Sequence, residues 1–315
     1  MKTLIAQIKE ANVRSQRLSI CGMQSKQSCS NQPLSLMDYQ GIIHYQPDEL
    51  VITVKAGTPL NELKCILAEN KQMLAFSPPD YGHSTLGGTY ACALTGSSQP
   101  FKGSLRDYVL GVKIINGLGD VLSFGGELMK NVAGYDVSRL LVGSRGQLAV
   151  IAEISLKVLP ITTETTYVVD IAENEAIQLM NQWAGSALPL SACAYYQQQF
   201  FYRLSRHHSK QPHTVVDEKI WEILNPFKPH LNADQSLWRV TVESTMPAIK
   251  NTQAIDWCGR RRWIIANEHP TYQGNKLNAS LWQGHADECP PTEPKALTQI
   301  KQGLKKVFDP KGVFC

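Results

Sequence analysis

The sequence predicts an α+β protein of two domains, which span residues 1–160 and 161–315. The chain has 315 residues, and a single domain usually takes about 100–200. The first half alternates between strand-like and helix-like segments separated by glycine loops. After Pro160 these glycine-bearing motifs stop, and a second set of strands and helices begins.

The predicted elements of the first domain follow from hydrophobic periodicity and from turn residues. Apolar residues at helical spacing indicate amphipathic helices, and β-branched runs that end at glycine or proline indicate strands. The sequence NGLGD between two such runs indicates a hairpin. The predicted helices span 1–14, 58–72 and 135–146. The predicted strands span 17–21, 49–57 and 147–160, with two more in 107–126 that are joined at 116–120.

The second domain is predicted by the same criteria. Its strands are expected at 165–172, 191–196, 200–205, 237–244 and 261–266. Its helices are expected at 173–185 and 294–310, the latter at the end of the chain. The polar, proline-bearing segment 276–294 is expected to be a loop.

Charge and composition exclude several classes of protein. The net charge of +4 is slight, and the longest run of like charges is Arg260–Arg262, so nucleic acid is not an expected partner. No C-x-x-C pair occurs among the eight cysteines, so no metal or iron–sulfur site is expected in this chain. No apolar run approaches the roughly 18 residues of a membrane span. We therefore expect a cytoplasmic protein with free thiols.

The segment Ser77–Gly96 contains so many small residues that either a large ligand lies against its backbone or two elements pack very closely there. Further glycines cluster after the first strand and around residues 103, 125 and 143–146. Several glycine loops can meet at one phosphate-bearing cofactor, because glycine lets backbone N–H groups approach anions closely. Each glycine could alternatively serve a turn. Neither G-x-G-x-x-G after the first strand nor a P-loop motif is present.

Two strings carry a family resemblance, PPDYGHSTLGG at 78–88 and FGGELMKNVAGYDVSRLLVGS at 124–144. They resemble the PCMH-type FAD-binding domain of the vanillyl-alcohol oxidase superfamily, and within it the E subunits of glycolate oxidases. The resemblance implies a two-subdomain FAD-binding domain followed by a smaller, cap-like α+β domain. It implies FAD as the cofactor and oxidation of a 2-hydroxy acid such as glycolate. It also implies a larger flavoprotein subunit and an iron–sulfur subunit as partners, through which the chain would reach the inner face of the plasma membrane.

The resemblance also implies which residues would contact FAD. The loop P-x-x-x-G-x-x-T-x-G-G lies beside the flavin in that family, with a threonine hydroxyl and glycine N–H groups available. Further contacts would come from the first strand, the loop after residue 102, the segment 130–136 and the strand that would hold adenine. The implied residues are Gly22, Ser25, Pro79, Gly82, Thr85, Leu86, Gly87, Gly88, Gly103, Arg106, Asp107, Asn131, Gly134, Tyr135, Gly143, Ser144, Gly146, Val150 and Ile151.

Other readings of some of these residues stay open. Arg106 and Asp107 could form a plain surface ion pair. Asp136 could interact with a helix N-terminus without any ligand. Met23 stands where the family has a glycine, which restricts approach to the backbone. Cys21 and His83 lie near expected flavin positions without forming a motif for covalent attachment.

The sequence does not identify a catalytic residue. Oxidation of a hydroxy acid by a flavin needs a base and a cation for the carboxylate, but no such pair stands out. Candidates in the second half are Arg203, Arg239, Arg260–Arg262, His207, His208 and His269, of which the arginine run could also form an interface. The chain is thus expected to carry flavin within a complex. The alternatives are a stand-alone oxidoreductase and an assembly subunit that has lost flavin, which Met23 and the end of the chain at Cys315 favour.

Overall fold

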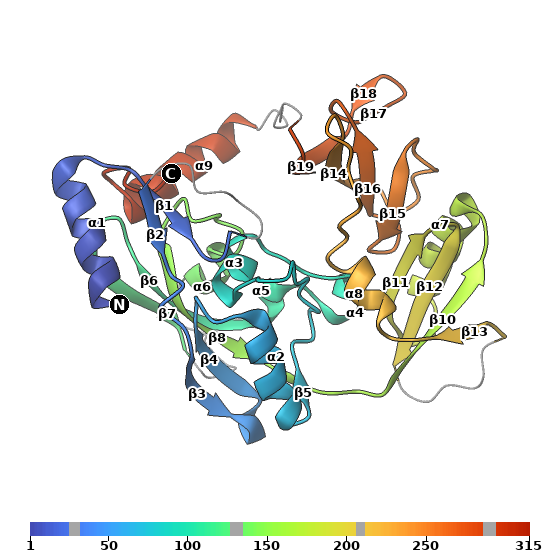
Figure 1. The fold of residues 1–315 in the computed structure, drawn as a ribbon, viewed down its shortest axis with the longest axis horizontal. Coiled ribbons are helices and arrows are strands. Elements are labelled where there is room, and N and C mark those ends of the chain that lie inside the picture. Colours follow the sequence, from blue (N-terminus) through green and yellow to red (C-terminus); the bar gives the residue numbers. More distant parts are fainter. Residues whose placement is uncertain (25–31, 127–134, 206–211, 286–293) are drawn as a thin grey trace. The chain divides into compact units, whose positions relative to one another are not determined.

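A computed structural model describes residues 1–24, 32–126, 135–205, 212–285 and 294–315 (Figure 1). These residues form two units, each with its own dense internal contacts. Unit 1 contains Met1–Thr95, Gly103–Ile161 and Glu293–Cys315, and unit 2 contains Gly96–Lys102 and Thr162–Thr292. The combination of helices with antiparallel sheets in both units confirms the predicted α+β class.

Unit 1 is built around a five-stranded antiparallel sheet with the strand order β3-β4-β8-β6-β7. The central strands β4 and β8 are buried at nearly every position, which suits their mostly apolar sequences. The edge strands β3 and β7 are mostly exposed or half-buried, as expected for strands covered on one side at most. The strands span Ile42–Gln46 (β3), Val51–Lys55 (β4), Val109–Ile115 (β6), Val121–Gly125 (β7) and Val150–Lys157 (β8).

The predicted hairpin between β6 and β7 is confirmed. The Oδ1 atom of Asn116 accepts hydrogen bonds from the backbone N–H groups of Leu118 at 2.9 Å and Asp120 at 2.8 Å. Gly119 has a φ of +83°, a conformation that favours glycine. The asparagine and the glycine together therefore close the turn.

Helices α1 and α2 contribute apolar faces to the core of unit 1, as the sequence predicted. Helix α2 buries Leu60, Leu63 and Leu67, and its i, i+3, i+7 spacing places these side chains on one face. The helices of unit 1 span Lys2–Arg14 (α1), Leu60–Glu69 (α2), Leu86–Ala91 (α3), Leu105–Tyr108 (α5), Val137–Leu140 (α6) and Lys295–Phe308 (α9), with a 3-10 turn at Pro47–Glu49. Short strands pair at Leu18–Cys21 (β1) with Gln32–Ser35 (β2) and at Gln72–Met73 (β5) with Leu159–Pro160 (β9).

The C-terminal segment belongs to unit 1, although the sequence assigned it to the second domain. Phe314 forms a parallel bridge with Leu18 of β1. The buried Asp309 accepts the backbone N–H groups of Val313 and Phe314, both at 2.8 Å. These contacts join positions at opposite ends of the sequence, and therefore no local pattern reports them.

Unit 2 contains an eight-stranded antiparallel sheet with the order β13-β10-β12-β11-β15-β16-β14-β19. Helix α7 (Glu173–Ala184) packs on one part of it through Ala176, Ile177 and Met180. The strands span Glu164–Asp170 (β10), Leu190–Tyr196 (β11), Gln199–Ser205 (β12), Thr214–Val216 (β13), Ser236–Thr241 (β14), Thr252–Asp256 (β15), Arg261–Ala266 (β16) and Asn278–Gln283 (β19). The remaining elements are helices Gln99–Lys102 (α4) and Ile220–Leu224 (α8), and the strand pair Thr271–Tyr272 (β17) and Asn275–Lys276 (β18).

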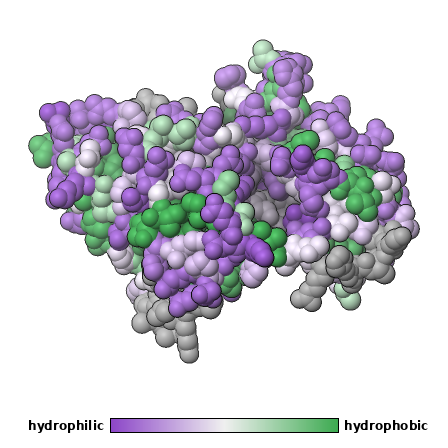
Figure 2. Space-filling view, turned by 60° about the horizontal axis from the view of Figure 1, so that its bottom comes forward, coloured by the Kyte–Doolittle hydropathy of each residue, from purple (hydrophilic) through white to green (hydrophobic). Residues whose placement is uncertain are grey.

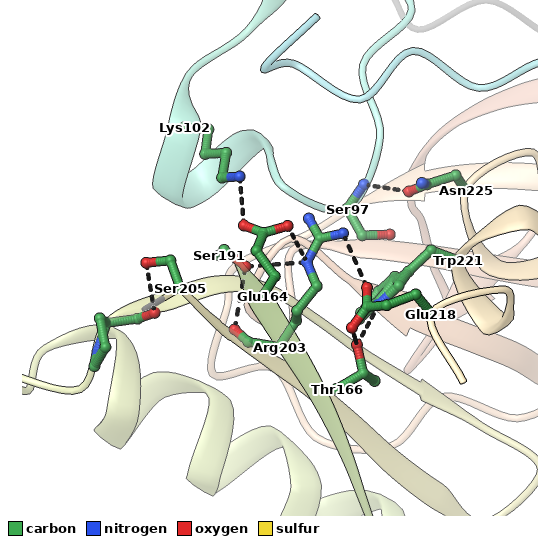
Figure 3. Close-up of polar contacts among 11 residues, drawn as sticks. Ser97, Lys102, Glu164, Thr166, Ser191, Arg203, Ser205, Glu218, Trp221 and Asn225 are labelled. Atoms are coloured by element: carbon green, nitrogen blue, oxygen red, sulfur yellow. Dashed lines mark hydrogen bonds and ion pairs between the residues drawn. The ribbon is translucent and has the colours of Figure 1, made fainter. Parts of the chain in front are cut away.

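The segment Gly96–Lys102 lies in unit 2, although it interrupts the sequence of unit 1. Lys102 Nζ pairs with Glu164 at 2.5 Å, and the other oxygen of that carboxylate pairs with Arg203 at 3.0 Å (Figure 3). The backbone N–H of Ser97 donates to the side chain of Asn225 at 2.9 Å. Polar contacts of this kind leave no hydrophobic pattern in the sequence, so a single boundary at residue 160 does not describe the two units.

Two segments expected to be loops contain regular structure. Strand β19 lies within 276–294. Its polar and apolar residues alternate in part, and it pairs with β14 at the edge of the sheet. Helix α3 lies within Ser77–Gly96. None of the helices in the described residues is long and apolar enough to cross a membrane.

Candidate cofactor-binding pocket

A pocket in unit 1 brings together segments that are far apart in the sequence. It holds about 790 Å³ of space outside protein atoms, part of which is open to solvent. Residues from the end of β1, the start of α3, the segment 145–149 and β8 line it. The predicted cofactor residues among them are Gly22, Thr85, Gly87, Gly88, Gly146 and Ile151.

Thr85 begins helix α3 at the pocket. Its hydroxyl accepts the backbone N–H of Gly88 at 3.1 Å, so it serves as the N-cap. The backbone N–H of Gly87 donates to the carbonyl of Ala56 at 2.7 Å. The expectation that both glycines would expose their N–H groups is therefore wrong for this structure.

Gly87 permits a close contact between α3 and the end of β4. A Cβ atom built on Gly87 would lie 2.7 Å from the Cβ of Ala56 and 2.8 Å from its carbonyl oxygen. Both distances are shorter than real contacts of this kind, so any larger residue would displace the helix. Close packing between two elements, one of the two readings of this small-residue segment, is thus confirmed at this position.

The end of β1 approaches the same threonine. A Cβ atom built on Gly22 would lie 2.8 Å from Thr85 Oγ1, so glycine allows this approach. Met23 and Gln24 line the pocket beside it, and Met23 is 39% exposed. The predicted Ser25 lies outside the described residues.

The segment Gly143–Gly146 is held against the end of α3. The backbone N–H groups of Gly143 and Arg145 donate to the carbonyls of Tyr90 at 3.1 Å and Ala91 at 2.9 Å. Gly146 has a φ of +76°, and a Cβ built on it would meet Ile20 of β1 at 3.3 Å. Arg145 was not among the predicted residues, yet it alone carries a formal charge among the described residues that line the pocket. Only the fold brings Arg145 to the pocket, so no local sequence pattern indicates it.

Strand β8 forms the far side of the pocket. Ile151 lines it, and the neighbouring Val150 is fully buried and pairs with Ile115 of β6. On the other side of β8, the ladder with β4 reaches only as far as the pairing of Lys55 with Glu153, extended by one hydrogen bond from Ala56 N–H to the Ala152 carbonyl.

Other predicted residues lie outside the lining of this pocket. Asp107 completes a capping box with Ser104, accepting its backbone N–H at 2.7 Å and its hydroxyl at 2.9 Å. Arg106 donates to the carbonyl of Val142 at 3.3 Å, so each of the two residues has a contact other than the surface ion pair considered above. The remaining predicted residues outside the lining are Pro79, Gly82, Leu86, Gly103, Tyr135, Gly143, Ser144 and Val150. Asn131 and Gly134 lie outside the described residues.

Asp136 acts as a helix cap, as one reading of the sequence expected. Its Oδ1 atom accepts the backbone N–H of Arg139 at 3.1 Å and the hydroxyl of Ser138 at 2.9 Å. The hydroxyl of Tyr90 donates to the carbonyl of Ser138, which ties α3 to α6. Burial raises the pKa of Tyr90 well above its usual range, so this phenol stays protonated as a donor.

Cys21 and Cys92 both line the pocket, and Cys21 differs from the expectation of free thiols. Cys21 is disulfide-bonded, whereas Cys65, Cys92, Cys193, Cys258 and Cys315 take part in no disulfide. Cys21 thus has no thiol available for attachment to a flavin. In the described part of the chain, no three His, Cys, Asp or Glu side chains are grouped so that they could hold a metal ion.

The arginines considered for catalysis in unit 2 have structural contacts. Arg262 is fully buried and donates to the carbonyls of Gly259 at 2.8 Å and Met246 at 2.7 Å, so it does not form an exposed interface. Burial lowers the pKa of Arg262 to about 10. Arg261 is also buried and pairs with Asp256, its Nε atom lying 2.6 Å from Oδ1. His207 and His208 lie outside the described residues.

Arg203 and Arg239 both lie beside tryptophans. Arg203 pairs with Glu164 and Glu218, and its guanidinium lies 5.2 Å from the ring centre of Trp221 (Figure 3). The guanidinium of Arg239 lies 4.7 Å from the ring centre of Trp282. Both guanidinium groups therefore have partners within the protein and do not require a ligand to explain their positions.

Comparison with known proteins places this chain among FAD-binding proteins. The FAD binding domain family matches residues 2–125. The glycolate oxidase subunit GlcE of Escherichia coli is 36% identical, in an alignment that covers 99% of this chain and 95% of that protein. The D-lactate dehydrogenase of Anaerostipes hadrus is 33% identical over 40% of this chain and 26% of its own length. A solved alkyldihydroxyacetonephosphate synthase has a similar fold, with a TM-score of 0.64 at 13% identity, covering 99% of this chain and 73% of the synthase.

The fold and these relatives define an FAD-dependent oxidoreductase with a PCMH-type FAD-binding domain. The pocket suits such a cofactor, because Arg145 supplies positive charge and aliphatic side chains line the β8 side. Within that class, the chain belongs to the family of the glycolate oxidase subunit GlcE.

Proposed function

We propose that the pocket of unit 1 holds FAD and that the chain is the FAD-carrying subunit of a glycolate oxidase. In this role it takes part in the oxidation of glycolate, or a similar 2-hydroxy acid, to the 2-oxo acid. The observation that carries the proposal is the meeting of residues 20–24, 84–94 and 145–151 at one pocket, in a chain that aligns with GlcE over nearly its whole length.

Different residues at the pocket would contact different parts of the cofactor. Arg145 lies within reach of the pocket and would offset the negative charge of the FAD phosphates. The Thr85 hydroxyl accepts from Gly88 and still has its own hydrogen to donate. Ile151, Ala149 and Leu94 give the apolar surface that an aromatic ring system needs. The flanking predicted residues Gly143, Ser144 and Val150 are included in the proposed site.

When bound, FAD would supply an acceptor for the hydride of the hydroxy acid. The residues of this chain would position FAD and keep its phosphates paired, and no residue is assigned as the base. In the same proposal, electrons leave through an iron–sulfur subunit towards a quinone-type acceptor, and a larger flavoprotein subunit completes the complex. That assembly would keep the chain at the inner face of the plasma membrane.

A visible absorbance spectrum of the purified full-length chain, before and after denaturation, tests the proposal. Flavin bands that are released on denaturation would establish non-covalent FAD. Addition of glycolate then separates the roles, because bleaching by the chain alone indicates a stand-alone enzyme and bleaching only with companion subunits indicates a subunit. A colourless chain that stays colourless after FAD is added would contradict the proposal and favour an assembly subunit.

A further inference from the structure

Helix α9 leaves most of its length uncovered. It is the longest helix in the described part of the chain, with 14 residues against 13 in α1 and 12 in α7. Helices α1 and α7 each bury three residues, whereas α9 buries only Phe308. Every residue from Lys295 to Gly303 is exposed. An isolated helix of this length is marginal in water, so packing partners normally stabilise it.

The contacts that hold α9 to unit 1 lie at its C-terminal end. Phe308 meets Phe124 of β7 edge-on, with ring centres 6.4 Å apart. Lys305 Nζ pairs with Asp309 at 2.7 Å and donates to the carbonyls of Phe314 at 2.7 Å and Gln147 at 2.5 Å. The C-terminal end is thereby fixed, and it holds the exposed turns in place.

The exposed turns carry an apolar stripe. Ala296, Ile300, Gly303 and Val307 follow the i, i+4, i+7, i+11 spacing of one helical side. Ile300 is 60% exposed and Val307 is 72% exposed. Gly303 lies between these two aliphatic side chains, and Ala296 lies before them, so that both small residues leave room for another surface to approach closely. Exposed apolar residues gathered in this way mark interaction surfaces. Figure 2 shows that hydrophobic residues gather in only a few places on the face it displays.

The charge of α9 indicates what kind of surface would cover it. The helix carries Lys295, Lys301, Lys305 and Lys306 and no acidic residue. A second copy of the same helix would bring like charges together, which disfavours self-pairing. Helices that lie on membranes usually add Trp or Phe to their apolar side, but the one aromatic residue of α9, Phe308, is buried in unit 1.

We propose that the exposed side of α9 docks an acidic surface with an apolar centre on a companion subunit of the same complex. This inference rests on the proposed function, because it requires the chain to work as one subunit among several. Ile300 and Val307 would fill the centre of the contact, and Lys295 and Lys306 would pair with acidic residues at its rim.

The test measures binding of the full-length chain to its co-expressed larger flavoprotein and iron–sulfur subunits by biolayer interferometry. The variant I300S/V307S is expected to bind at least about tenfold more weakly. The charge reversal K295E/K306E is expected to slow association at low salt. The matched control is V215S/I223S in unit 2, where the exposed fractions are 61% and 54%, and it should bind like the wild type. All variants should keep the wild-type melting temperature and flavin spectrum.

Each other outcome overturns the inference. Equal binding by I300S/V307S and the wild type would exclude α9 as the docking surface while leaving the subunit function intact. A wild-type chain that binds none of the companion subunits would remove the subunit function as well. If I300S/V307S loses a dimer that the wild type forms in light scattering, with companion binding unchanged, the stripe would be assigned to a second copy of the chain. If I300S/V307S loses the binding of the wild type to phosphatidylglycerol vesicles, again with companion binding unchanged, the stripe would be assigned to a membrane.

Discussion

Gly87 and Ala56 join the start of α3 to the end of β4 through one short hydrogen bond and one close backbone approach. The N–H of Gly87 donates to the Ala56 carbonyl at 2.7 Å, and a Cβ on Gly87 would lie 2.7 Å from the Cβ of Ala56. The pocket-facing turn of α3 is therefore fixed by packing inside unit 1, before any cofactor is considered.

Replacement of Gly87 by alanine should destabilise the protein. The added methyl group has no room against Ala56, and overpacking of this kind costs about 1–3 kcal/mol. The measurement is the free energy of unfolding in urea, followed by circular dichroism. Gly303→Ala is the control, because this helical glycine has nothing within 4 Å and should gain about 0.5–1 kcal/mol. Equal stability of G87A and the wild type would show that β4 and α3 can move apart freely.

The same region shows how much of the pocket could be predicted from the sequence. Small residues in 77–96 predicted either a ligand or close packing, and Gly87 shows packing while Gly88 lines the pocket. The sequence could not indicate that the N–H of Gly87 is already used, because its acceptor, the carbonyl of Ala56 just after β4, is far from it in the sequence. Arg145 was missed for a related reason, since only the fold brings that loop to the end of α3.

The strands were predicted best where apolar runs are long and bounded by glycine or proline, as in β4 and β8. Strand β15, with the sequence TQAID, was missed because its half-polar run carries little β-strand signal. Hydrophobic periodicity reports local structure only. It therefore could not predict the bridge between Phe314 and Leu18 or the place of 96–102 in unit 2, which both depend on long-range contacts.

Replacement of Arg145 by glutamine should weaken FAD binding by at least about tenfold. A hydrogen bond to a charged group contributes about 1.5–3 kcal/mol, and tenfold corresponds to about 1.4 kcal/mol. Flavin fluorescence quenching measures the affinity for FAD and for riboflavin, which lacks phosphate. Riboflavin affinity should stay unchanged, and Arg14→Gln on α1 should leave both affinities as in the wild type, because its partner is Glu10 on the surface. An equal loss for both flavins would mean that Arg145 shapes the pocket rather than binding phosphate.

Replacement of Thr85 by alanine should lower stability by about 1 kcal/mol, because the capping hydrogen bond to Gly88 is lost. Serine keeps a hydroxyl in the same place and should restore most of that stability. Thermal unfolding of the three proteins checks the order wild type, T85S, T85A. If T85S melts as low as T85A, then the methyl group of Thr85, and not its hydroxyl, stabilises the turn.

Glu173 should make the stability of the protein depend on pH in a defined direction. Burial raises the pKa of this carboxyl above its ordinary value of 4.5, although Arg262 opposes the shift. As the pH rises above 4.5, the unfolded chain releases this proton before the folded chain does, so stability falls until the raised pKa is passed. Glu173→Gln cannot titrate, and its stability relative to the wild type should therefore increase between pH 4 and pH 7.

The comparison needs a second carboxyl on the same helix. Glu175 lies in the first turn of α7, as Glu173 does, but it is exposed. Glu175→Gln therefore makes the same change of side chain at an exposed position and serves as the matched control. Urea unfolding of the three proteins at several pH values gives both differences. If the E173Q difference changes with pH no more than that of E175Q, the attraction of Arg262, 3.6 Å away, offsets the effect of burial on Glu173.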